Sequence, residues 1–109
     1  MKLHLIRLRT NVNATAEYDI MTGSVTVLKG SIVSETIAYS EKFRGAKSIE
    51  RHRAGVVNGT KVITDVIFKS ASTAANFVTG ASTNGLTAWK DENGKTLKAI
   101  LTEKEGKNE

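Results

Sequence analysis

Apolar and polar residues alternate with a period of two along the first part of the chain. In residues 2–8, leucines alternate with polar side chains. In residues 12–18, every second residue is apolar or aromatic: Val12, Ala14, Ala16 and Tyr18. Residues 25–27 repeat the period after a turn that ends at Gly23. Because successive side chains of a strand point to opposite faces, the pattern predicts three strands, each with one buried face.

Two later segments of the chain carry helix patterns. The clearer one is residues 70–80, where four apolar residues follow at helical spacing: Ala71, Ala74, Ala75 and Val78. Ser70 is placed to cap its first turn and Gly80 to end it in the left-handed conformation. The alanines give this helix a thin face, so we expect it to pack closely against a sheet. The second pattern is a short helix over residues 45–55, with Ser48 as its cap.

Short strands are predicted on either side of the clearer helix. Asn58-Gly59 predicts a type I′ turn in a hairpin over residues 56–68, because both turn residues tolerate positive φ. Residues 86–90 are predicted as a short strand. Residues 95–101 follow as a strand or a last helical turn.

These elements predict an α+β fold in one small domain, residues 1–98, followed by a polar, flexible tail over residues 99–109. Antiparallel strands and hairpins form the sheet, and two or three short helices pack on one face. A chain of 109 residues fits a single domain.

Composition excludes several classes of protein. The chain contains no cysteine, which excludes a disulfide framework and thiolate chemistry. No apolar run approaches the ~20 residues of a membrane span, and no secretion signal is visible. We therefore expect a cytoplasmic protein that does not bind membranes.

Enzyme motifs are absent from the sequence. There is neither a P-loop nor a G-x-G-x-x-G pattern. His4 and His52 lie far apart and lack the spacing of a zinc site. Asp65, within a strand pattern, is expected to accept a hydrogen bond from a backbone amide. We therefore expect a protein that is not an enzyme, with no catalytic residue, no metal and no cofactor.

Positive charge is concentrated in one segment of a chain whose net charge is +5. Five cations lie between positions 42 and 53, opposed only by Glu50: Lys42, Arg44, Lys47, Arg51 and Arg53. A helical stripe of this kind could neutralise phosphates. A solvated basic helix without a partner accounts for the same pattern. Arg7 and Arg9 on the first strand either extend the basic patch or protect the strand edge from pairing.

Residues 68–97 carry a motif that resembles the bacterial and archaeal domain-of-unknown-function family numbered 4357. The matching residues are Phe68, Ser70, Ser72, Ala74, Ala75, Gly80, Asn84, Gly85, Trp89, Lys90, Gly94 and Leu97. Residues 14–31 resemble the N-terminal segment of the same family. Two positions depart from the motif, since the family usually carries Pro where this chain has Ala71 and often Trp where it has Leu86.

The resemblance implies a family without an established activity, whose members occur alone or fused to nuclease and restriction-modification modules. The chain is also similar to the restriction-enzyme and adenine-methylase associated domain, which is thought to bind DNA. We therefore predict a small non-catalytic module that binds DNA or another polyanion and is associated with such systems. The alternative is a protein-interaction or structural module, a homo-oligomer or accessory subunit, that binds no nucleic acid.

The predicted residues fall into two sets. The nucleic-acid contacts would come from Arg44, Lys47, Arg51, Arg53, Asn84 and Lys90. The loop at residues 82–84 could add hydroxyl and amide groups. The motif residues with a structural role would be Ser70, Ser72, Ala74, Ala75, Gly80, Gly85 and Trp89. Because a large aromatic in a small domain is usually buried, Trp89 is expected to pack on the helix over residues 70–80.

Overall fold

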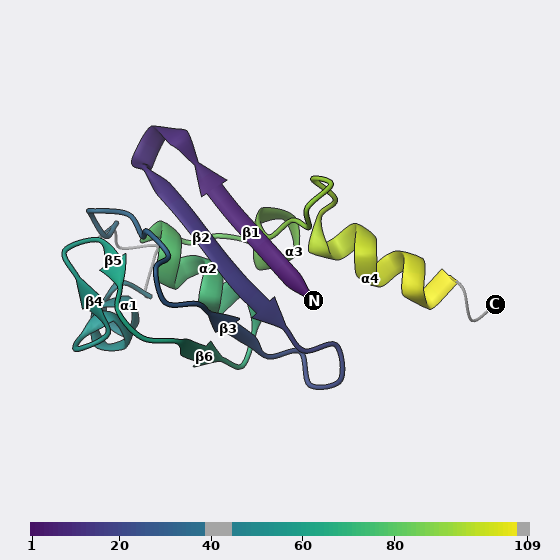
Figure 1. The fold of residues 1–109 in the computed structure, drawn as a ribbon, viewed down its shortest axis with the longest axis horizontal. Coiled ribbons are helices and arrows are strands. Elements are labelled where there is room, and N and C mark those ends of the chain that lie inside the picture. Colours follow the sequence, from purple (N-terminus) through teal and green to yellow (C-terminus); the bar gives the residue numbers. More distant parts are fainter. Residues whose placement is uncertain (39–44, 107–109) are drawn as a thin grey trace.

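A four-stranded antiparallel sheet forms one layer of the fold, and helix α2 packs against it (Figure 1). The computed structural model describes residues 1–38 and 45–106, with side chains up to residue 103. In spatial order the strands are β1 (Lys2–Arg7), β2 (Val12–Tyr18), β3 (Val25–Val27) and β6 (Val66–Phe68). The predicted α+β fold class is confirmed.

The first two strands pair in the register that their alternating pattern requires. Leu3 lies opposite Ala16 and Leu5 opposite Ala14, and all four side chains are buried. The intervening polar residues therefore lie on the other face of the sheet. A 3-10 turn, η1 (Leu8–Thr10), joins the two strands. The strands predicted in the N-terminal part of the chain are confirmed.

Helix α2 (Ala71–Thr79) has both predicted ends. Ser70 Oγ accepts a hydrogen bond from the Thr73 N–H at 3.2 Å, and Gly80 follows the last turn with a φ of 72°. The apolar side chains that it buries are Ala71, Ala74, Ala75, Phe77 and Val78. The small alanines let the helix approach the sheet closely, as their pattern predicts.

Helix α1 (Ala46–Arg53) lies within the predicted range of residues 45–55, but it begins before the predicted cap at Ser48. Its N-cap position is Gly45, which has no side chain to cap the first turn. Ser48 lies inside the helix, where its Oγ is 3.4 Å from Nδ1 of His52, so its predicted capping role is wrong. Ala46, two residues before Ser48, is buried and already belongs to the helix.

Strands β4 (Val57–Asn58) and β5 (Lys61–Val62) form the first part of the predicted hairpin over residues 56–68, but with a different turn, and β6 at its end pairs with β3 instead. Asn58 pairs with Lys61, so the turn residues are Gly59 and Thr60. Gly59 has a φ of 65°, whereas Thr60 does not have a positive φ. Glycine at the first turn position suits a type II′ turn, and the type I′ prediction is wrong. The observed register buries Val62 completely.

The segment over residues 86–90, predicted as a strand, contains helix α3 (Gly85–Ala88) instead. The Asn84 side chain caps this helix by accepting a hydrogen bond from the Leu86 N–H at 3.0 Å. Leu86 is exposed, whereas Gly85 and Trp89 are buried. Burial therefore recurs after four residues, which is the spacing of a helical turn, and the strand prediction is wrong for residues 86–88. Lys90 does form antiparallel β-bridges, with His4 and Thr96.

The chain ends in helix α4 (Leu97–Gly106), which extends away from the sheet in Figure 1. The predicted boundary at residue 98 falls inside this helix, and the segment 99–106 of the predicted tail is helical. The described residues thus contain four α-helices, where the sequence predicted two or three. None of these helices is both long and apolar enough to span a membrane.

Candidate functional site

Trp89 fixes the segment that follows α3 to the body of the domain. Its side chain is 0% exposed, and the indole Nε1–H donates to the carbonyl oxygen of Ala71 at 3.0 Å. Ala71 opens α2, so the tryptophan joins α3 to the start of α2. The prediction that Trp89 belongs to the core is confirmed.

A second contact of the same motif joins Gly85 to Ser72. The Gly85 N–H donates to Ser72 Oγ at 3.0 Å. A Cβ atom added at Gly85 would overlap the main chain of Ala71 and Ser72, so only glycine fits without a shift of the backbone. Ser72 and Gly85 therefore act as structural residues, as predicted.

Replacing Gly85 by alanine is expected to lower the free energy of unfolding by about 1–3 kcal/mol, because overpacking forces α2 and α3 apart. Urea unfolding followed by circular dichroism measures the loss. Thr87→Ala, at an exposed position of the same short helix, is the matched control and should change stability by less than about 1 kcal/mol. Equal stability of wild type and Gly85→Ala would contradict the close approach of Gly85 to the main chain of Ala71 and Ser72.

The anchored segment continues along the free edge of β1. The Lys90 N–H donates to the His4 carbonyl at 2.9 Å, and the His4 N–H donates to the Lys90 carbonyl at 2.7 Å. The side chain of Lys90 is exposed beside the strand. The two residues lie at opposite ends of the sequence, and Figure 1 shows α3 next to β1.

The main chain of β1 is only partly paired on this edge. In an antiparallel ladder, alternate residues direct their N–H and C=O groups to opposite sides. Met1 bonds to Tyr18 of β2, so the odd-numbered residues of β1 direct their main-chain groups toward β2. His4 bonds to Lys90 on the other side, and Ile6, two residues later, directs its groups to that same side. Among the described residues, the N–H and C=O of Ile6 meet no partner.

A groove of about 320 Å³ lies between this edge and the segment before Lys90. We call it the edge groove. Its lining residues are Leu5, Ile6, Arg7, Ser82, Thr83, Asn84, Thr87, Ala88 and Lys90. Arg7 and Lys90 are exposed, neither forms an ion pair with a described residue, and no carboxylate lines the groove. Asn84 Oδ1 accepts from Leu86, which leaves its NH2 group to donate outward.

A second hollow of about 490 Å³ adjoins the edge groove. We call it the face hollow. Its lining residues are His4, Ile6, Ala88, Lys90, Asp91, Glu92 and Gly94. Asp91 Oδ1 accepts hydrogen bonds from the N–H groups of Asn93 and Lys95, both at 2.9 Å, so this carboxylate shapes the turn. Glu92 is exposed and forms no ion pair with a described residue.

The predicted basic cluster on α1 is divided by the structure. Lys47 and Arg51 are exposed on α1, which Figure 1 places at the opposite end of α2 from α3. Arg44 lies outside the described residues. The predicted contact residues thus do not form one surface: Asn84 and Lys90 line the edge groove, together with Arg7, and Lys47 and Arg51 lie elsewhere.

Arg53 holds α1 against the end of α2. Its guanidinium donates to the Phe77 carbonyl from Nε at 3.0 Å and from Nη2 at 2.7 Å. It also donates to the carbonyl and the hydroxyl of Ser34 at 2.9 and 3.0 Å. A guanidinium so placed has few donors left for a phosphate. We therefore assign Arg53 to the fold and leave it out of the candidate surface.

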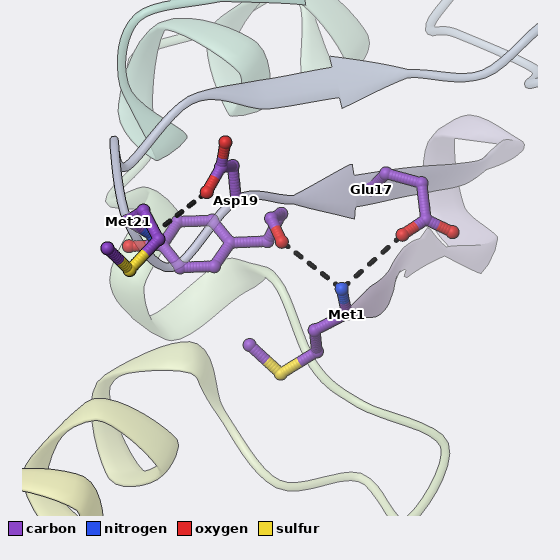
Figure 2. Close-up of polar contacts among 5 residues, drawn as sticks. Met1, Glu17, Asp19 and Met21 are labelled. Carbon is purple, nitrogen blue, oxygen red and sulfur yellow. Dashed lines mark hydrogen bonds and ion pairs between the residues drawn. The ribbon is translucent and has the colours of Figure 1, made fainter.

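A third hollow, of about 530 Å³, lies at the other end of β1 and carries the opposite charge. Figure 2 shows its polar contacts: the Met1 amine lies 3.4 Å from Glu17 Oε2, and Asp19 Oδ1 accepts from the Met21 N–H at 2.9 Å. No lysine or arginine lines this hollow. The edge groove is therefore the better candidate for an anionic ligand.

The sequence did not indicate that Arg7 and Lys90 would meet across the edge groove. It singled out Lys90 and Asn84 by their motif and Arg7 by its charge. Asp65 accepts a hydrogen bond from the Lys29 N–H at 2.8 Å, which confirms its predicted structural role.

The family model described as "Domain of unknown function (DUF4357)" matches residues 6–101 of the chain. The chain belongs to the DUF4357 family. In comparisons with curated proteins and with solved structures, nothing matches. The matched segment includes the Ser72–Gly85 contact, the Trp89 anchor and both cations of the edge groove. The DUF4357 motif residues that the sequence singled out thus largely position this groove.

Proposed function

We propose that this DUF4357 domain is a non-catalytic nucleic-acid-binding module, and that its phosphate-binding surface is the edge groove. The observation that carries the proposal is the convergence of Arg7 and Lys90, both exposed and without an ion-pair partner among the described residues, on a groove free of carboxylates.

The other lining groups suit a phosphodiester backbone. Phosphate oxygens accept hydrogen bonds from arginine, lysine, hydroxyl, amide and main-chain N–H donors. The groove offers the Asn84 amide, the Ser82 hydroxyl and the N–H of Ile6 in addition to its two cations. The acidic third hollow at the other end of β1 would repel the same backbone. Charge therefore also favours binding of the nucleic acid at the end of β1 that carries the edge groove.

The alternative, a protein-interaction module, is supported by one feature of the same edge. The N–H and C=O groups of Ile6 are unpaired among the described residues and could pair with an extended strand of another chain. Lys90 already pairs with His4 in the middle of β1, so this edge offers no continuous stretch to a long strand, and we therefore place nucleic acid first. We propose association with restriction-modification or nuclease systems on the family resemblance alone, and a cytoplasmic location on the composition of the chain.

Binding to nucleic acid should weaken steeply with salt. For two or three phosphate contacts, counterion release predicts that affinity falls roughly 7- to 40-fold between 50 and 200 mM salt. Fluorescence anisotropy with labelled single-stranded and duplex oligonucleotides measures this slope. Light scattering of the free protein provides the control for self-association. No binding at 50 mM salt, or binding that salt does not weaken, would exclude the proposal.

A further inference from the structure

The edge groove and the face hollow adjoin each other and share part of their walls. Ile6, Ala88 and Lys90 line both. A ligand that occupies one can therefore extend into the other without leaving the surface of the domain. What differs between the two is their chemistry.

The edge groove suits an anion better than the face hollow does. Lys90 lines both, but two carboxylates, Asp91 and Glu92, line only the face hollow, whose lining also includes Ile6 and Ala88. Ile6 is 58% exposed, so apolar surface is available for a ligand to cover. A phosphate would be repelled by Glu92. A neutral, flat group could cover the apolar side chains with one face and donate a hydrogen bond to Glu92 from an amino group.

We infer that the face hollow takes the base of one unpaired nucleotide, whose phosphate lies in the edge groove; this inference rests on the proposed function. A nucleobase offers apolar faces to Ile6 and Ala88, and its exocyclic amine can donate to the Glu92 carboxylate, as cytosine N4 donates to acidic side chains. In a duplex both base faces are stacked, so only a single-stranded or extruded base can enter. At about 490 Å³ the hollow is within the range of small-molecule sites.

The substitution Glu92→Gln tests the inference by the sign of its effect. Removal of one negative charge should strengthen the binding of any polyanion if Glu92 acts only through charge. If Glu92 accepts from a base amine, the substitution replaces a charge-assisted hydrogen bond by a weaker neutral one to the glutamine Oε1, and should instead weaken binding to oligo(dC) about 3- to 10-fold at pH 7.5. Binding to oligo(dT), which has no exocyclic amine, should be unchanged or stronger.

The matched control is Glu35→Gln, the same change at an exposed residue outside both hollows. It should affect oligo(dC) and oligo(dT) equally. Ile6→Thr, which keeps a β-branched residue in the strand, should weaken both single strands about threefold more than it weakens a duplex. Wild type should bind oligo(dC) more tightly than a duplex of the same length.

The outcomes separate this inference from the function on which it rests. Equal, salt-dependent binding of oligo(dC), oligo(dT) and duplex, with no selective effect of Glu92→Gln, would keep the phosphate-binding groove and overturn the base site. Absence of binding to all three would overturn both. Selective weakening of oligo(dC) by Glu92→Gln, with Glu35→Gln neutral, is the result that the inference predicts.

Discussion

Replacing Trp89 by alanine is expected to lower the free energy of unfolding by about 3–5 kcal/mol, which is typical of a large-to-small change at a buried aromatic. The side chain is 0% exposed, and its removal also leaves the Ala71 carbonyl without the indole donor. Since domains are stable by about 5–15 kcal/mol, much of the stability would be lost. Urea unfolding followed by far-ultraviolet circular dichroism measures the change, because the variant has no tryptophan fluorescence.

Two further variants identify the cause of the loss. Trp89→Phe keeps a ring in the core but removes the N–H donor, and should cost about 1–3 kcal/mol. Leu86→Ala, at a position that is 39% exposed in the same segment, should cost less than about 1 kcal/mol. A loss below about 1 kcal/mol for Trp89→Ala would contradict its role as the anchor of the segment that holds Lys90.

Much of the fold could be predicted from local patterns. The period-two alternation of residues 2–8 and 12–18 indicated the first strands, and Ser70 and Gly80 marked the ends of α2. These predictions succeed because strand faces and helix caps depend on neighbouring residues. The turn at Gly59 and the helix at residues 85–88 could not be predicted in the same way, since tertiary burial of Val62 and Gly85 decided their registers.

The candidate site depends on contacts that the sequence does not display. The main chain of Lys90 pairs with that of His4 because the buried Trp89 indole is hydrogen-bonded to the Ala71 carbonyl. No local sequence pattern links these positions. Charge alone could not distinguish Arg53, whose guanidinium donates to main-chain carbonyls, from Arg51, which is exposed. Residue type thus indicated which side chains could bind an anion, and the three-dimensional arrangement decides which of them share a groove.

The second large expected effect is on affinity. The double variant Arg7→Ala, Lys90→Ala should weaken binding of a single-stranded oligonucleotide roughly 25- to 100-fold at 0.1 M salt, because each phosphate bound by a cation contributes about 5- to 10-fold. The salt slope should become shallower by about 1.4, since each such phosphate on a single strand contributes about 0.7. Both side chains are exposed, so the variant should keep the fold, as circular dichroism can verify.

The central claim is tested most directly by comparing this variant with Lys47→Ala, Arg51→Ala, which removes the same charge from the exposed surface of α1. Anisotropy titrations of both variants at 0.1 M salt, with one labelled oligonucleotide, give the comparison. If the edge groove binds phosphate, the groove variant loses most of its affinity and the α1 variant less than about threefold. Equal losses, or a larger loss for the α1 variant, would contradict the assignment of phosphate binding to the edge groove.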